Sequence, residues 1–236
     1  MIKTEWVTLH IIVAMWANPM GNLLSAQVDS VKKVAIDTNA DLLSRYIWRG
    51  QDYSNSPCIQ PDLELSWKAL TFGSWGSYKF AGGGTDETDL YLSATSGIFT
   101  FAIWDYWYLN DTSFTDFFNY NRKTTNHLLE AQVLLSGKEN LPFSLLGSYF
   151  FYGADKSGSI YLELQYKHAI GPAEMLFFIG VQPKGNYYAP KKGIVNFGCT
   201  GKKSIDVTDR VSLPVSISFI LNPFTKIAYL VASLSI

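Results

Sequence analysis

The residues whose side chains could do chemistry are His127, His168 and one glycine-rich segment, and none of them completes a catalytic motif. Neither histidine lies in a His-Glu-x-x-His sequence, and no cysteine adjoins either of them as a second metal ligand. The 198–204 segment has Lys203 where a phosphate-binding loop needs Ser or Thr after its lysine. A Gly-x-Ser-x-Gly nucleophile elbow does not occur. The sequence therefore predicts no catalytic residue, no metal site and no cofactor.

One enzymatic alternative remains, because His127 shares the strand parity of the apolar residues Leu129 and Ala131. A serine hydrolase needs a histidine within hydrogen-bond reach of a serine, and a third group that orients the histidine ring. The sequence offers no way to choose that serine. We keep a lipid hydrolase built on an apolar wall as the weaker hypothesis. A histidine bonded to water or to lipid headgroups is the stronger one.

The composition restricts the elements that could position such residues. The 236-residue chain is 47% hydrophobic, 15% aromatic and 17% charged, and this aromatic content excludes a disordered chain. Its 19 basic and 20 acidic side chains leave no electrostatic footprint for nucleic acid. Cys58 and Cys199 are too few and too far apart for a disulfide scaffold or a zinc site. No apolar run of about 18 residues follows residue 26, so membrane helices are excluded and a β-rich chain with little charge remains.

The first 26 residues have the order of a secretory signal peptide. Lys3 precedes an apolar stretch over 7–16, and the segment ends in small residues at Ala26. The apolar stretch is too short to span a membrane as a helix. We therefore predict a signal peptide over 1–26 and an exported mature chain over 27–236. A short buried helix that caps a soluble domain is the alternative.

From Val31 onward, apolar and polar residues alternate with the period of two that indicates β-strands. Leu129 and Ala131, for example, alternate with Glu130 and Gln132. The twelve segments that follow this pattern are 33–49, 61–69, 70–80, 85–97, 98–109, 126–137, 141–153, 157–169, 173–183, 194–205, 210–221 and 226–236. An even number of strands is typical of bacterial outer-membrane barrels.

The lengths of the connections distinguish a barrel from a sandwich. The long connections, over 50–60, 110–125 and 184–193, are all odd-numbered, whereas the even-numbered connections are short. Short turns at one rim and longer loops at the other are typical of outer-membrane barrels, and a Greek-key sandwich has no reason to keep this alternation. We therefore expect an all-β fold, an up-and-down antiparallel transmembrane β-barrel of about 12 strands, over 27–236. A secreted β-sandwich is the alternative.

Aromatic residues gather near the ends of the expected strands. Their amphipathic rings would suit the headgroup level of a bilayer, where one edge of each ring is in contact with water. Cross-strand aromatic pairs in a soluble sheet are the alternative. The residues concerned are Tyr46, Trp48, Trp67, Tyr78, Phe80, Trp104, Tyr106, Tyr108, Tyr149 and Phe151.

The segment 44–50, Ser-Arg-Tyr-Ile-Trp-Arg-Gly, resembles the opening signature of the TorF-type porin family, bacterial outer-membrane proteins without an assigned function. Pro61 and the 73–77 segment, Gly-Ser-Trp-Gly-Ser, are similar to the strand start and the strand that follow in that family. The 151–155 segment, Phe-Tyr-Gly-Ala-Asp, and the 221–223 segment, Leu-Asn-Pro, resemble its Bacteroides-type branch. The resemblance implies an outer-membrane barrel, and it implies no established substrate.

If the apolar positions face lipid, the charged residues of opposite parity face the lumen. On the first expected strand they run from acidic at Asp37 to basic at Arg49, a column that could line an aqueous path. Alternatively, the charges pair across a narrow lumen and plug it, because side chains can fill much of a barrel of this size. The expected lumen-lining residues are Asp37, Asp41, Arg45, Arg49, Glu64, Lys68, Lys79, Asp89, Glu130, Glu163, Lys167 and Lys202.

The longest expected loop, 110–125, would either fold into the mouth of the barrel as a constriction or present a binding surface. Its candidate residues are Phe114, Phe117, Phe118, Tyr120 and Arg122. The function we expect is porin-like passage of small polar solutes or ions through the outer membrane of a Gram-negative bacterium, with outer-membrane lipid as the other partner. A closed structural or ligand-binding barrel with functional extracellular loops is the second hypothesis, ahead of a barrel-wall lipid hydrolase.

Overall fold

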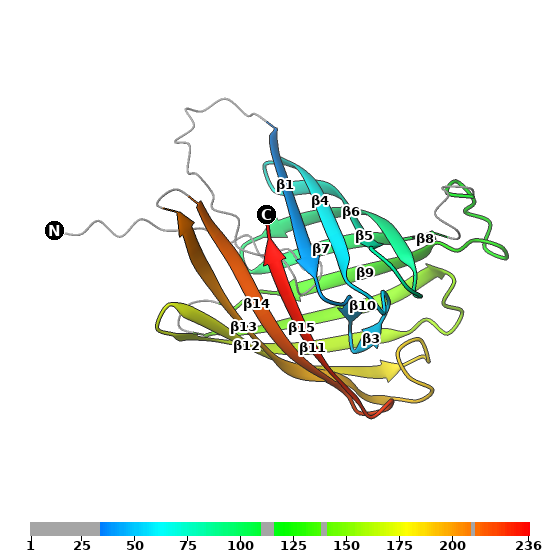
Figure 1. Ribbon diagram of the computed structural model, residues 1–236. Coiled ribbons are helices and arrows are strands. Elements are labelled where there is room, and N and C mark those ends of the chain that lie inside the picture. Colours follow the sequence, from blue (N-terminus) through cyan, green and yellow to red (C-terminus); the bar gives the residue numbers. More distant parts are fainter. Residues whose placement is uncertain (1–33, 110–115, 138–140, 209–210) are drawn as a thin grey trace.

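The computed structural model describes residues 34–109, 116–137, 141–208 and 211–236, and the predicted signal peptide lies outside them (Figure 1). Every secondary-structure element assigned within these ranges is a β-strand. This part of the chain contains no helix long and apolar enough to cross a bilayer. The long strands are β1 (Ala35–Leu43), β4 (Cys58–Trp67), β5 (Leu70–Lys79), β6 (Asp86–Ser96), β7 (Phe99–Tyr106), β9 (Leu128–Leu135), β10 (Phe143–Gly153), β11 (Ile160–Ile170), β12 (Ala173–Lys184), β13 (Gly193–Thr208), β14 (Val211–Asn222) and β15 (Ile227–Ser235).

The long strands form one antiparallel sheet that closes on itself. Each long strand pairs with its neighbours in the chain, and β1 also pairs with β15, where Asp41 lies opposite Ser235. A short strand, β8 (Tyr108–Leu109), continues the pairing of β7 with β6. Closure gives every long strand two partners, so none of them is left as a sheet edge. The predicted up-and-down antiparallel barrel of twelve strands is confirmed, and the sandwich alternative is wrong.

The two rims of the barrel carry connections of different length. The start of β1 and the end of β15 lie at one rim, which we call the end rim, together with tight turns at 68–69 and 171–172. The other rim, which we call the loop rim, carries the long connections 44–57 and 185–192 and the shorter 154–159, whereas 136–142 is the longest connection at the end rim. This asymmetry agrees with the lengths expected from the sequence.

Alternation along the strands puts apolar side chains outside the wall and polar side chains inside. The outward-facing Phe101, Ile103 and Val133 are 42 to 52% exposed, whereas the inward-facing Glu130 and Glu163 are at most 1% exposed. In a soluble protein the apolar residues would face the interior. An apolar band on the outside is the arrangement of barrels that lie in lipid.

The first predicted strand, 33–49, is wrong at its C-terminal end. β1 stops at Leu43, and residues 44–57 turn into the barrel. There, β2 (Ile47–Trp48) and β3 (Gln51–Asp52) form a small hairpin. The physical reason is burial, because the hairpin places large aromatic rings in the lumen, where they leave water.

The turn of this hairpin has a backbone geometry that fixes its position. Arg49 and Gly50 have φ angles of 49° and 79°, and positive φ at both central positions indicates the type I′ turn of two-residue hairpins. A Cβ at Gly50 would lie 2.3 Å from the carbonyl oxygen of Val195, so only glycine fits this close approach. The side-chain amide of Asn222 donates to the Gly50 carbonyl at 2.9 Å. The hairpin is thereby bound to the wall strands β13 and β14.

Two inward-facing tyrosines lie over glycines of the neighbouring strand. Tyr91 on β6 is opposite Gly73 on β5, and a Cβ at Gly73 would lie 2.1 Å from the tyrosine ring. Tyr161 covers Gly180 in the same way, because a Cβ at Gly180 would lie 2.1 Å from the hydroxyl oxygen of Tyr161. The Tyr91 ring has little freedom to move, because it also stacks on Trp104 with 4.2 Å between ring centroids. The glycines therefore make room for aromatic rings that fill the barrel.

Replacing Gly73 with alanine should destabilise the barrel by about 1–3 kcal/mol, because the added methyl group overpacks the Tyr91 ring. The measurement is the urea midpoint of unfolding, for which the folded fraction is read from the gel mobility of unboiled samples. Gly83→Ala is the matched control, because a Cβ at Gly83 meets nothing within 4 Å. Equal midpoints for the two variants would contradict this account of the packing.

Candidate functional site

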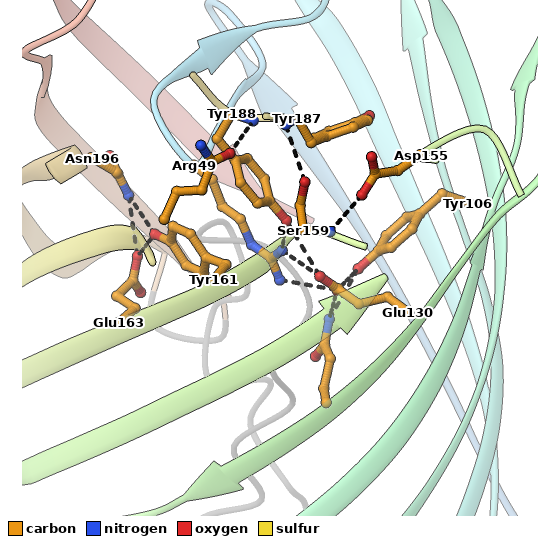
Figure 2. A network of polar contacts seen from close by, with 12 residues as sticks. Arg49, Tyr106, Glu130, Asp155, Ser159, Tyr161, Glu163, Tyr187, Tyr188 and Asn196 are labelled. Atoms are coloured by element: carbon orange, nitrogen blue, oxygen red, sulfur yellow. Dashed lines mark hydrogen bonds and ion pairs between the residues drawn. The ribbon is translucent and has the colours of Figure 1, made fainter. Parts of the chain in front are cut away.

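The loop-rim half of the lumen contains a network of polar contacts centred on Arg49, at the turn of the β2–β3 hairpin (Figure 2). Its guanidinium donates to both carboxylate oxygens of Glu130 on β9, with distances of 2.5 Å from Nη1 to Oε1 and 3.0 Å from Nη2 to Oε2. The two side chains are 4% and 0% exposed. Bidentate contacts of this kind are among the strongest hydrogen bonds in proteins. The pair joins residues 44–57 to the barrel wall.

Aromatic rings enclose the guanidinium. Its carbon atom lies 4.4 Å from the ring centroid of Trp48 and 4.5 Å from that of Tyr161. Tyr188 also approaches, and its hydroxyl accepts a hydrogen bond from Arg49. Contacts between a desolvated cation and aromatic faces stabilise it by up to about 2 kcal/mol each. The charge of Arg49 is therefore neutralised by a carboxylate and separated from water by the rings.

Further donors complete the environment of Glu130. Its Oε2 atom accepts hydrogen bonds from the Tyr106 hydroxyl at 2.7 Å and from the Gln132 amide at 2.5 Å. Desolvation of a buried ion pair is offset only when the geometry is good and the remaining lone pairs are satisfied. Both conditions are met at Glu130.

A second loop-rim segment, residues 185–192 between β12 and β13, also enters the lumen. Gln182 holds its backbone, because Oε1 of Gln182 accepts the N–H of Tyr188 at 2.8 Å. The hydroxyls of Tyr187 and Tyr53 are hydrogen-bonded at 3.2 Å, which links this segment to residues 44–57. We call residues 44–57 and 185–192 together the lumen plug.

The 154–159 loop supports the lumen plug from the rim. The hydroxyl oxygen of Ser159 accepts the backbone N–H of Tyr187 at 3.1 Å. Asp155 in turn accepts the backbone N–H groups of Ser157 at 2.9 Å and of Ser159 at 2.6 Å. Partial burial alone would raise the pKa of Asp155, but hydrogen bonds from Ser157 and Ser159 outweigh it and hold this pKa below its ordinary value.

A small cavity lies between the lumen plug and the wall. Its volume is about 30 Å³, enough for one or two water molecules on the order-of-magnitude scale of buried hydration sites. It is too small for an organic cofactor. The charged, amide and aliphatic-hydroxyl side chains that line it are Arg45, Arg49, Gln60, Asn196, Thr200 and Ser218.

Most of the predicted lumen-lining residues face the interior of the barrel. Lys79 lies at the loop rim instead, where its ammonium group pairs with Asp86 at 3.1 Å. Whether any of these side chains lines a path for solutes stays a prediction. The residues that face inward are Asp37, Asp41, Glu64, Asp89, Glu130, Glu163, Lys167 and Lys202.

The remaining predicted lumen residues are placed differently. Arg45 and Arg49 lie in the lumen plug and not on a wall strand, and Arg45 pairs with Asp52 of the same hairpin at 2.8 Å. Lys68 is exposed in the tight turn at the end rim, where its ammonium group lies 4.4 Å from the ring centroid of Trp67. The predicted column of charges along the first strand is therefore wrong, because the chain leaves the wall before either arginine.

The predicted constriction in the 110–125 loop is wrong for the described residues. Phe114 lies outside the described residues. Phe117 packs edge-on against Trp107, with 5.1 Å between ring centroids, and Trp107 belongs to the outward-facing parity of β7. Phe118, Tyr120 and Arg122 are exposed on the same segment. The lumen plug occupies the mouth instead, and a binding role for this loop stays a prediction.

Eight of the ten aromatic residues predicted at the headgroup level divide into two groups, and the half-buried Tyr78 and Tyr108 belong to neither. The first group lies on the outward face, where rings could reach the headgroup level. Its members, which are 41 to 63% exposed, are Trp67, Phe80, Tyr149 and Phe151. Other rings pack in the lumen at 5% exposure or less, and these are Tyr46, Trp48, Trp104 and Tyr106. For the second group the interpretation is wrong. Sequence reasoning therefore missed the core of the site, although the residues themselves had been singled out.

Both ring nitrogens of His127 have partners in the described part of the chain, and neither of these is a serine. Within the described residues, Nδ1 contacts Asp105 Oδ1 at 2.7 Å and Nε2 contacts the carbonyl oxygen of Phe117. The expected orienting acid is therefore present, but the position of the nucleophile is taken by a backbone carbonyl. The described part of the chain also groups no three His, Cys, Asp or Glu side chains around a possible metal ion, and Cys58 and Cys199 are both free.

The fold and the site together define a class of protein, a closed twelve-stranded antiparallel barrel with a lumen plug held by a buried ion pair. No protein-family model matches the chain, and no curated protein or solved structure matches it either. The resemblance to the TorF-type porin family stays a prediction.

Removing one partner of the Arg49–Glu130 pair should destabilise the folded barrel by about 3–5 kcal/mol, because an unpaired charge is left buried. Urea midpoints for Arg49→Ala and Glu130→Ala measure this loss. Arg45→Ala is the matched control, since its pair with Asp52 is partly exposed and such pairs contribute about 0–1 kcal/mol. Similar losses for Arg45→Ala and Arg49→Ala would show that burial of the pair is not what matters.

Asp155 should make the stability of the barrel depend on pH. Because its pKa is lower in the folded state than in the unfolded chain, its contribution is present above the unfolded pKa of about 3.9 and is lost as pH falls through the folded pKa. Asp155→Asn should therefore reduce the urea midpoint at neutral pH and leave it nearly unchanged in strong acid. A loss that is constant across this pH range would contradict the electrostatic origin.

Proposed function

We propose that this protein is an outer-membrane β-barrel whose lumen is closed by the lumen plug in the conformation described, and that displacement of the plug opens a path for small polar solutes or ions. The observation that carries the proposal is the buried pair of Arg49 and Glu130, which ties the plug to the wall. The loop rim would lie at the cell surface and the end rim in the periplasm.

The membrane location is supported by the outer surface of the wall. Large apolar side chains on neighbouring strands are well exposed there, including Phe72 at 47%, Leu92 at 51% and Ile103 at 51%. Contiguous apolar surface of this kind marks contact with a membrane or with another protein. A closed barrel also satisfies its backbone hydrogen bonds within the wall, as lipid requires.

The width of the barrel explains why a plug is present. Barrels of about 8 strands are filled by their own wall side chains, whereas those of about 16 enclose an aqueous channel. A barrel of twelve strands falls between these cases, so its bore needs added chain if it is to be closed. Trp48 and Tyr188 supply it here, at 5% and 4% exposure.

Passage of solutes is supported by the polar lining on the end-rim side of the plug. Asp41, Asp62 and Glu64 face the interior there, and Lys167 and Lys202 share that side. Many pores select ions by means of rings of charged side chains. When the plug leaves, Arg49 and Glu130 would both become hydrated, which offsets the loss of their contact.

Conductance in planar bilayers tests this proposal. We expect the wild-type barrel to be closed most of the time, with rare openings. Glu130→Gln keeps the shape of the side chain and removes its charge, so it should raise the open probability at least tenfold while the barrel stays folded. Arg45→Ala is the control, because its rim pair does not join the plug to the wall.

Two results would overturn the proposal. Steady wild-type conductance at the level of Glu130→Gln would mean that the plug does not close the lumen. A Glu130→Gln barrel that is inserted but never conducts, and that admits no sugars in liposome swelling, would exclude the path. That second result would favour the alternative of a closed structural or ligand-binding barrel.

A further inference from the structure

The segment of residues 116–125, which we call the flap, lies at the loop rim, beyond β8 and before β9 (Figure 1). Asp105 and Trp107 point outward, because Tyr106 between them points into the lumen and is only 2% exposed. Trp107 and His127 are nevertheless 3% and 0% exposed. Their burial on the outward face comes from the flap.

A compact cluster, which we call the clasp, holds the flap on the wall. His127 contacts Asp105 through Nδ1 at 2.7 Å and the carbonyl oxygen of Phe117 through Nε2. Tyr120 stacks on the His127 ring, with 4.1 Å between centroids and 20° between planes. The Tyr120 hydroxyl donates to Asp105 Oδ2 at 2.6 Å. Both oxygens of Asp105 are thus used to fix one loop.

The flap is also tied to the next strand and loop. The Tyr152 hydroxyl donates to the carbonyl oxygen of Tyr120 at 2.5 Å, and the ammonium group of Lys156 donates to that of Arg122 at 2.7 Å. Contacts to β7, to the approach of β9 and to β10 therefore hold the flap at a set height on the wall.

The flap exposes two aromatic rings, Phe118 and Tyr120, and three charged side chains, Asp116, Arg122 and Lys123. Phe118 is 88% exposed, although its neighbour Phe117 is packed inward against Trp107. Arg122 and Lys123 are exposed on the same flap. A fully exposed phenylalanine is unfavourable in water, but aromatic rings and basic residues are both favoured at the headgroup level of a bilayer.

We propose that the flap is an interfacial anchor, in which Phe118 enters the boundary of the acyl chains and Arg122 and Lys123 bind the phosphate groups of anionic lipid headgroups. This inference rests on the proposed membrane location. It commits to lipid because the flap packs on Trp107, on the outward face that also carries Phe101 and Ile103, and those two side chains are 52% and 51% exposed. The clasp positions the anchor at the height where that band ends.

An environment-sensitive fluorophore attached at residue 118 tests the anchor. Phe118→Cys is made in a Cys199→Ser background, since Cys199 is partly accessible whereas Cys58 is fully buried. The barrel is labelled after folding into vesicles that contain a bilayer-embedded quencher lipid. We expect blue-shifted emission and quenching at position 118. The same label at Gly83→Cys should remain water-like, because Gly83 is an exposed loop-rim residue outside both the flap and the lumen plug.

A third label, at Phe101→Cys on the outward band, separates the two proposals. Quenching at 101 with water-like emission at 118 would overturn the anchor and leave the membrane barrel intact. Water-like emission at both positions would overturn the membrane location as well. If a ligand or another protein covers Phe118 in the cell, the label at 101 should be quenched and the label at 118 should be water-like, because the vesicles contain no such partner.

The basic residues are tested by lipid charge. Quenching at position 118 should be stronger in vesicles with phosphatidylglycerol than in purely zwitterionic vesicles. Arg122→Gln with Lys123→Gln should remove that difference without changing the signal at 101. Equal quenching in both lipid mixtures for the unaltered flap would overturn the headgroup contact.

Discussion

A charge taken out of water has to be paired, and in this barrel the pair of Arg49 and Glu130 also decides where a whole loop lies. Arg49 enters the lumen because Glu130 and the rings of Trp48 and Tyr161 offer it a partner and a dry surface. The hairpin that carries it then fills a bore that twelve wall strands leave wider than their own side chains can pack. In the function we propose, closure of the lumen therefore depends on one polar contact and the aromatic packing around it.

The same requirement accounts for the composition. The chain has 17% charged residues, against about 25% in typical soluble domains, and many of its charges lie inside the wall and at the rims. Lys79 with Asp86 and Arg45 with Asp52 pair at the loop rim. The outward face needs no charge if lipid covers it.

Strand positions could be predicted because a period of two is a local property, and eleven of the twelve expected segments lie on wall strands throughout most of their length. The lumen plug could not be predicted in the same way. The first part of the plug keeps the alternation of the strand before it, with Tyr46 and Trp48 on one parity. The pattern therefore predicts that β1 continues through these residues. What marks the hairpin is the Arg49-Gly50 turn, and what holds it is a contact to a residue 81 positions away. Long-range contacts of this kind leave no trace in local periodicity.

The alternation of side chains along β9 also explains why the flap and the lumen plug, which both belong to the loop rim, are held on opposite sides of the wall. His127 and Glu130 are three residues apart at the start of β9, so one side chain points outward and the other inward. The first takes part in the clasp that holds the flap, and the second binds the lumen plug. Both depend on the register that pairs Leu129 with Asp105, because a shift by one residue would exchange the two faces. The start of β9 therefore contacts both the outer flap and the inner plug.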